Sequence, residues 1–161
     1  MKRVLLVLGL GVCLVAFVAW LGFRGARPAR LPESLHADRE TAARAGAFEL
    51  GWLPAFVPAG ARELREVHDP TTTRTWGRFV LAAPGWFPEI KKGALLPGET
   101  GLRGPPLKLE WWPADAAGKV SSLVLEQRGW RVTLVDEARG PIFVAVRGTE
   151  VVFWRLARSD I

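Results

Sequence analysis

Residues 122–156 read SLVLEQRGWRVTLVDEARGPIFVAVRGTEVVFWRL, in which short runs rich in β-branched and aromatic residues alternate with breaks that contain glycine. Glycine can adopt the positive φ that tight hairpin loops require. Connections this short join only antiparallel neighbours. The stretch therefore predicts a four-stranded antiparallel meander, with strands at Ser122–Gln127, Trp130–Asp136, Ile142–Val146 and Val151–Leu156.

The alternation of apolar and polar residues in Trp130–Leu134 predicts that this sheet has one dry face and one wetter face. Residues 82–107 are rich in proline and glycine, which predicts a long irregular loop. Upstream of the meander, further strands are predicted at residues 63–68, 76–81 and 107–112. The expected fold class is thus mainly β, a small antiparallel sheet with a long Pro/Gly loop.

One N-terminal transmembrane helix is expected to precede this domain. Residues 4–23 read VLLVLGLGVCLVAFVAWLGF and contain no charge. As a helix this run is about 30 Å long, the thickness of the hydrocarbon layer. The basic residues that flank it, and that we expect at the membrane surface, are Lys2, Arg3, Arg24, Arg27 and Arg30.

Two other readings of the apolar run are a cleaved signal peptide and a lipoprotein signal. A signal peptide has a shorter apolar region, about 7–15 residues, followed by a small-x-small site. A lipoprotein signal requires a small residue before the lipidated cysteine, whereas Val12 precedes Cys13. We favour an uncleaved signal anchor, and the cleaved signal stays open.

The sidedness of the domain is expected from the charges that flank the anchor. The counts on the two sides almost tie, but a very short basic amino terminus is typical of a signal anchor whose N-terminus stays inside. We therefore expect a single-pass protein of the bacterial inner (cytoplasmic) membrane with a periplasmic C-terminal domain, and the opposite topology stays open. The predicted division is residues 1–23 anchor, 24–50 basic linker and short helical spacer (a helix from Ser34 to about Arg44), and 51–158 β-rich domain.

The distribution of charge argues against a nucleic-acid partner. Five of the 22 basic residues and none of the 16 acidic residues lie in residues 1–30, so residues 31–161 carry 17 basic and 16 acidic side chains. A nucleic-acid-binding domain needs its surplus positive charge on the folded surface.

Cys13 is the only cysteine, and the two histidines are too few for a metal site, so we expect no metal and no cofactor.

The candidate catalytic residues are His68, Glu66 and Asp69. Glu66 and His68 stand two apart on a predicted strand and therefore project from one face, and Asp69 follows directly. A carboxylate beside a histidine can fix its tautomer and raise its basicity, as general base catalysis requires. The plainer interpretation, which we favour, is that Asp69-Pro70 begins a turn and His68 ends a strand.

Trp86, Trp111 and Trp112 are candidate ligand-binding residues. Trp111 and Trp112 are adjacent on a predicted strand, so their rings should face opposite sides of the sheet. One ring would then be exposed or covered by the 82–107 loop, where Trp86 lies. An exposed indole can contact a sugar, a lipid headgroup or a protein; burial of both rings in the core is the alternative.

Several of these residues together resemble a family of small bacterial proteins of unknown function that carry an N-terminal signal or anchor. The resemblance covers about residues 51–156. It rests on the run Arg65-Glu66-Val67-His68-Asp69, on Trp76 and Phe79, on Trp111-Trp112-Pro113 and on the closing Phe153-Trp154. It implies a membrane setting and no particular reaction.

The function expected from these observations is a membrane-anchored noncatalytic accessory or interaction module at the extracytoplasmic membrane face. Its partners would be the lipid bilayer and a protein or envelope component. One alternative is a small hydrolase or lyase that uses His68 with Glu66 or Asp69. Another is an envelope ligand-binding sensor with an exposed tryptophan site.

Overall fold

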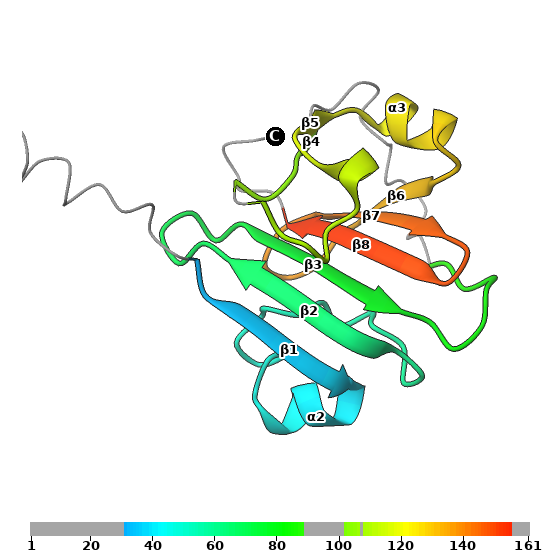
Figure 1. Cartoon of the computed structure of the whole chain (residues 1–161). Coiled ribbons are helices and arrows are strands. Elements are labelled where there is room, and N and C mark those ends of the chain that lie inside the picture. Colours follow the sequence, from blue (N-terminus) through cyan, green and yellow to red (C-terminus); the bar gives the residue numbers. More distant parts are fainter. Residues whose placement is uncertain (1–30, 89–101, 107, 156–161) are drawn as a thin grey trace, which may run out of the picture. The chain divides into compact units, whose positions relative to one another are not determined.

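The computed structural model describes residues 31–88, 102–106 and 108–155. All of them belong to one compact unit, Leu31–Ile161, which is separate from the unit Met1–Arg30. Its centre is a six-stranded antiparallel sheet in the order β1-β2-β3-β8-β7-β6 (Figure 1). The strands are β1 (Glu33–Asp38), β2 (Arg62–His68), β3 (Thr75–Val80), β6 (Arg131–Val135), β7 (Ile142–Arg147) and β8 (Glu150–Arg155).

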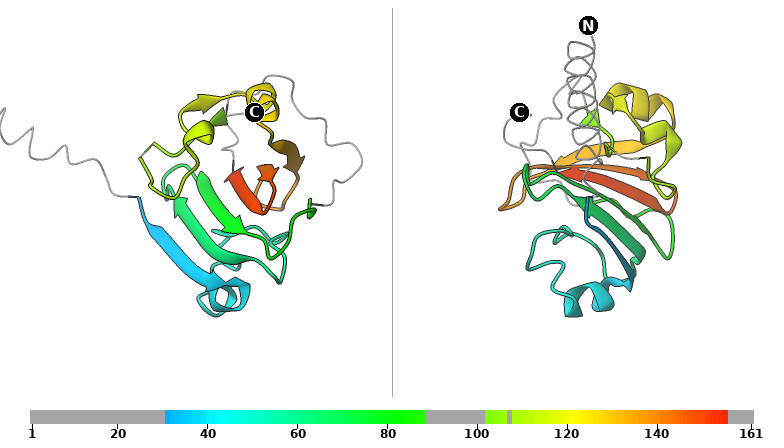
Figure 2. Two further views of the ribbon diagram at one scale, coloured as in Figure 1. Left: turned by 45° about the vertical axis from the view of Figure 1, so that its right-hand side comes forward. Right: turned by 60° about the vertical axis from the view of Figure 1, so that its left-hand side comes forward.

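Short elements cover both faces of this sheet (Figure 2). On one face lie α2 (Arg39–Arg44) and residues 45–61, which we call the strap. On the other face lie residues 102–106 and 108–130, which we call the cap; they include β4 (Leu102–Arg103), the 3-10 turn η1 (Ala114–Ala116), β5 (Lys119–Val120) and α3 (Ser122–Gln127). The prediction of one dry and one wetter face is therefore wrong, because each face buries its own apolar core.

The two cores use alternate residues of the same strands. Trp76, Val152 and Trp154 face the cap together with Trp112 and Trp130. The strap-side core contains Leu64, Phe79, Val144, Val151 and Phe153 together with Leu53 and Val57 of the strap. Because successive side chains of a strand point to opposite faces, a strand buried on both sides needs apolar residues at nearly every position. β7 and β8 meet this requirement, since five apolar residues of β7 and four of β8 are buried.

The predicted C-terminal meander is confirmed for three of its four strands, β6, β7 and β8. Its first segment, Ser122–Gln127, is a helix and the strand prediction there is wrong. The hydroxyl of Ser121 accepts a hydrogen bond from Val124 N–H at 3.3 Å and so caps the helix, and Gly129, at φ 83°, follows its end. Gly129 therefore ends a helix and does not form the hairpin loop that the sequence predicts.

The upstream strand predictions at residues 63–68 and 76–81 are confirmed as β2 and β3. The strand predicted at residues 107–112 is wrong for its described part, since residues 108–112 form a turn in which Trp112 N–H donates to Leu109 C=O at 3.2 Å. Of the predicted Pro/Gly loop, residues 82–88 and 102–106 are described, and residues 89–101 and 107 lie outside the described residues.

The helix predicted from Ser34 begins only at Arg39, because residues 33–38 pair with β2 as strand β1. Asp38 then caps the helix by accepting the N–H of Thr41 at 2.8 Å. Residues 31–50, most of the predicted linker and spacer segment, thus lie in the compact unit.

The predicted anchor, residues 4–23, and its flanking Lys2, Arg3, Arg24, Arg27 and Arg30 lie outside the described residues. In the part of the chain that the structure does describe, no helix combines the length and the apolarity needed to cross a membrane.

Candidate functional site

Glu66 and His68 form a hydrogen-bonded pair on the strap side of β2. His68 Nδ1 lies 3.1 Å from Glu66 Oε2, and the two side chains share a face because they are two residues apart on the strand. Glu66 is fully buried, whereas His68 is half-buried. These two candidate catalytic residues therefore contact each other in the structure.

Three residues from other segments complete this cluster. Trp52 of the strap stacks on the His68 ring, with ring centroids 4.5 Å apart and planes 12° apart. Ser34 and His36 lie on β1, where they pair with Glu66 and Leu64 of β2. His36 is 8% exposed. Both histidines of the chain lie close enough to Glu66 for their charges to act on its pKa.

Burial raises the pKa of Glu66 above its ordinary value. Hydrogen bonds from Ser34 and His68, and the charges of the two histidines, act in the opposite direction but do not offset the loss of hydration. Within the described ranges, no group of three or more His, Cys, Asp and Glu side chains is placed to hold a metal ion. The buried carboxyl group of Glu66 can bind a proton beside two histidines.

Asp69 does not join this pair. Its carboxylate accepts hydrogen bonds from Thr71 N–H at 2.9 Å, from the Thr71 hydroxyl at 2.6 Å and from the Thr72 hydroxyl at 2.7 Å. These bonds lower its pKa to about 2. Asp69 therefore stabilises the turn between β2 and β3, as the plainer interpretation of this sequence predicts.

Glu66→Gln should flatten the dependence of stability on pH. A carboxyl group whose pKa is higher in the folded than in the unfolded state binds its proton more tightly when folded, so the free energy of unfolding falls as pH rises between the two pKa values. The interval begins at the ordinary pKa of a glutamate side chain, 4.5. Glutamine binds no proton there, so the variant should match or exceed the wild type in stability at neutral pH.

The measurement is urea unfolding of both proteins from roughly pH 4 to pH 8. Glu126→Gln is the control, because Glu126 is exposed on α3. If the wild type gained stability relative to Glu66→Gln as pH rises, the assigned direction of the Glu66 pKa would be wrong.

The three candidate tryptophans do not converge. Trp86 packs on the strap side, edge-on to Phe79 at 5.8 Å between ring centroids. Trp111 and Trp112 both lie in the cap-side core, at 9% and 6% exposure, and contact each other edge-on at 5.9 Å. The expectation that these two rings face opposite sides is wrong, because residues 108–112 form a turn and not a strand.

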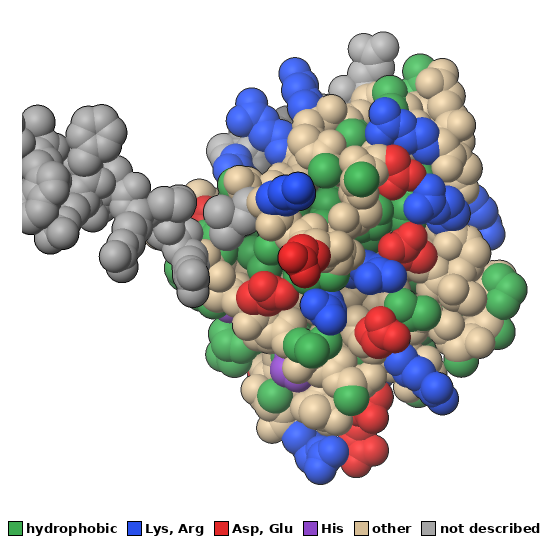
Figure 3. Space-filling view, in the orientation of Figure 1, with side chains coloured by type: hydrophobic (Ala, Val, Ile, Leu, Met, Phe, Trp, Pro, Cys, Tyr) green, Lys and Arg blue, Asp and Glu red, His purple; other side chains and the backbone are tan. Residues whose placement is uncertain are grey.

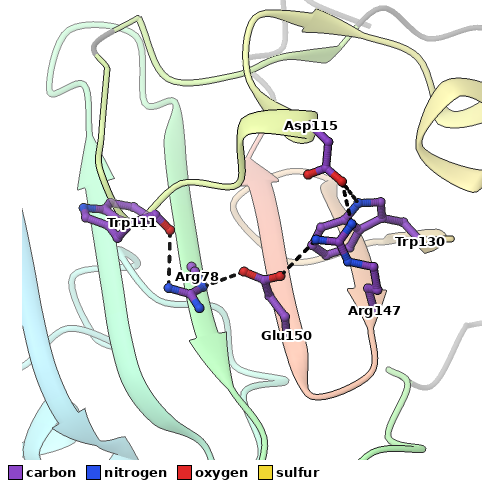
Figure 4. A network of polar contacts seen from close by, with 6 residues as sticks. All are labelled: Arg78, Trp111, Asp115, Trp130, Arg147 and Glu150. Atoms are coloured by element: carbon purple, nitrogen blue, oxygen red, sulfur yellow. Dashed lines mark hydrogen bonds and ion pairs between the residues drawn. The ribbon is translucent and has the colours of Figure 1, made fainter. Parts of the chain in front are cut away.

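A polar network joins the cap to the sheet (Figure 4). Glu150 lies between two cations, with Oε1 2.9 Å from Arg78 Nε and Oε2 3.3 Å from Arg147 Nη2. Arg147 Nη1 also lies 2.5 Å from Asp115 Oδ2, and Trp130 Nε1 donates to the same oxygen at 3.2 Å. Burial alone would raise the pKa of Asp115, but these two donors lower it. The network therefore holds η1 of the cap against β7 and β8.

The outer edge of β1 is a surface feature that the sequence did not predict. In the described part of the sheet, β1 pairs only with β2. His68 N–H donates to Pro32 C=O at 3.3 Å, and alternate residues of an antiparallel strand turn their backbone groups to opposite sides. The residues that turn their N–H and C=O groups outward are therefore Glu33, Leu35 and Ala37.

The side chains of these three residues are exposed, and Leu35 is 59% exposed, the highest value for a large apolar residue in the described chain. Acidic and basic side chains are interspersed over the centre and lower part of the face drawn in Figure 3. The signal was weak in the sequence, because β1 has no apolar alternation of its own and forms by pairing with β2.

Fold and site together define a small, mainly β domain with a buried carboxyl–histidine cluster and an open sheet edge at β1. Residues 32–80, which are 49 of the 161 residues, match the family model described as the YbbD head domain. The match takes in β1, α2, the strap, β2 and β3, and it points to a small bacterial family. Neither a curated protein nor a solved structure matches the chain.

Proposed function

We propose that this protein is a membrane-anchored, noncatalytic interaction module at the extracytoplasmic face of the bacterial inner membrane, and that it contacts its partner through the outer edge of β1. The anchor and its sidedness rest on the sequence of residues 1–30. The contact surface rests on one observation, the row of outward backbone groups at Glu33, Leu35 and Ala37 beside an exposed leucine.

An open edge strand supports binding for a physical reason. Its unpaired N–H and C=O groups can add one more strand to the sheet, and the backbone hydrogen bonds supply affinity while side chains set specificity. Proteins often protect such edges with lysine or proline. β1 carries no lysine, and its central residue is Leu35. The edge is therefore suited to pairing with another extended segment.

The anchor has a direct test. The full chain should stay in the membrane pellet after alkaline carbonate extraction, because about twenty apolar residues hold it in lipid. Release of the intact chain into the supernatant would contradict the proposal. A reporter fused to the C-terminus, active only outside the cytoplasm, tests the sidedness.

The contact surface is tested by a photo-reactive amino acid placed at position 35 in cells. Position 123 is the matched control, since Leu123 is 53% exposed on α3. We expect a covalent adduct from position 35 and none from position 123. Ala37→Pro should abolish the adduct, because it removes an outward N–H and no hydrogen bond to β2. Equal yields from both positions, or no adduct at all, would contradict the proposed surface.

A second candidate, a small hydrolase or lyase, is favoured by the 3.1 Å contact between His68 and Glu66. His68→Gln separates the two candidates, because glutamine can keep a hydrogen bond to Glu66 but cannot act as a general base. We expect a loss of about 1 kcal/mol in unfolding free energy and full complementation of a deletion strain. A folded variant that fails to complement would instead support the enzyme.

A ligand-binding sensor has no comparable support, since Trp86 and the Trp111–Trp112 pair lie on opposite faces of the sheet.

A further inference from the structure

We infer that the segment which pairs with β1 is β1 of a second copy of this chain, added antiparallel about a two-fold axis at Leu35. The inference rests on the proposed function, because it names the partner at the edge assigned there. It predicts a symmetric dimer in which two six-stranded sheets join into one continuous sheet.

The register follows from the outward backbone groups. When Leu35 lies opposite Leu35 of the second copy, Glu33 lies opposite Ala37 and Ala37 opposite Glu33. All outward N–H and C=O groups of both strands then meet a partner. If the two-fold axis passed through Glu33 or Ala37 instead, some of the outward N–H and C=O groups of each β1 strand would have no partner. The centred register also sets the two exposed leucines side by side, so each buries apolar surface against the other.

The charges of β1 favour the same arrangement. β1 contains two acidic residues, Glu33 and Asp38, and no basic residue. A parallel, in-register pair would place each acid beside its own copy, and like charges on directly opposed residues are destabilising. In the antiparallel register Glu33 faces Ala37 and Asp38 faces Pro32, so the acids avoid each other.

The opposite edge of the sheet, β6, is less open. The guanidinium of Arg131, the first residue of β6, lies 4.2 Å from the centre of the Phe87 ring, which brings residues 81–88 close to that end of the strand. Among the described strands, β1 is therefore the better edge for a second sheet.

The length of chain before β1 is compatible with two anchors in one bilayer. At 3.4 Å per residue, the Leu31 residues of the two copies would lie about 27 Å apart. Residues 24–30 can span up to about 23 Å in each copy. Two such linkers can reach from the ends of the paired strands to one membrane surface.

The test is cysteine cross-linking of the full chain in membranes, in a Cys13→Ser background. In the proposed register the Cα atoms of residue 35 in the two copies lie about 5.5 Å apart, within disulfide range. Leu35→Cys should therefore give a dimer on mild oxidation or with a short bis-maleimide, and Leu123→Cys should not. Ala37→Cys alone should give little dimer, whereas Glu33→Cys mixed with Ala37→Cys should give it.

The outcomes separate the inference from the proposed function. A Leu35→Cys yield no higher than that of Leu123→Cys overturns the two-fold pairing. If the photo-reactive residue at position 35 then yields an adduct with another protein, the edge still binds but its partner is not a second copy. If position 35 yields no adduct of any mass, both the pairing and the proposed contact surface are wrong.

Discussion

Gly77→Ala should destabilise the domain by about 3 kcal/mol. A Cβ on Gly77 would lie 2.1 Å from Cζ of the Phe153 ring, a distance that no side chain can accept without movement. Gly77 lies on β3 between Glu66 of β2 and Phe153 of β8, and Phe153 is 1% exposed. The ring therefore crosses the glycine toward the buried carboxyl cluster, and it can move away only by disturbing a close-packed core.

Gly60→Ala is the matched control. The same added atom at Gly60 would meet only Ala82 Cβ, at 3.9 Å, which is ordinary contact. This change should alter the unfolding free energy by less than about 1 kcal/mol, and the shift should tend toward stabilisation. Urea unfolding followed by tryptophan fluorescence measures both variants. Equal midpoints for Gly77→Ala and the wild type would mean that Phe153 does not pack over Gly77.

Local sequence pattern was enough to predict the strands that are joined by short glycine loops. β7 and β8 are nearly continuous apolar runs linked through Gly148, which has a φ of 60°. α3 was misread for a physical reason, since a run such as Leu123-Val124-Leu125 fits a strand or a helix equally well. The residues that indicate a helix lie at the two ends of the run: Ser121 is the N-cap, and Gly129 follows the last turn of α3.

β1 and the carboxyl–histidine cluster could not be predicted from the sequence, because both depend on contacts between residues that are far apart in the chain. The sequence of β1 has no strong strand signal, and its hydrogen bonds come from β2, about thirty residues later in the chain. The same limit applies to the carboxyl–histidine cluster. The spacing of Glu66 and His68 predicted their shared face, but nothing local indicates that Trp52 stacks on His68 or that His36 arrives from β1.

Glu137→Ala should also cost about 3–5 kcal/mol of unfolding free energy, because it leaves a buried cation without its anion. Glu137 Oε2 lies 3.2 Å from Nη2 of Arg155, whose side chain is 4% exposed. The other carboxylate oxygen accepts the N–H of Ala55 at 2.8 Å, so Glu137 also fastens the strap to the sheet. The exposed Glu126→Ala provides a control for loss of an acidic side chain, with an expected change under about 0.5 kcal/mol.

Replacement of both partners separates charge from packing. Burial lowers the pKa of Arg155, a sign that its charge is poorly hydrated and depends on Glu137. Apolar side chains of similar size need no such partner, so Glu137→Leu with Arg155→Met should recover most of the stability that Glu137→Leu alone loses. Limited proteolysis within residues 45–61 should be faster in both variants than in the wild type, because each of them lacks the Glu137 oxygen that accepts the N–H of Ala55. Purely additive losses in the double variant would mean that Glu137 stabilises the domain through the Ala55 hydrogen bond and not through Arg155.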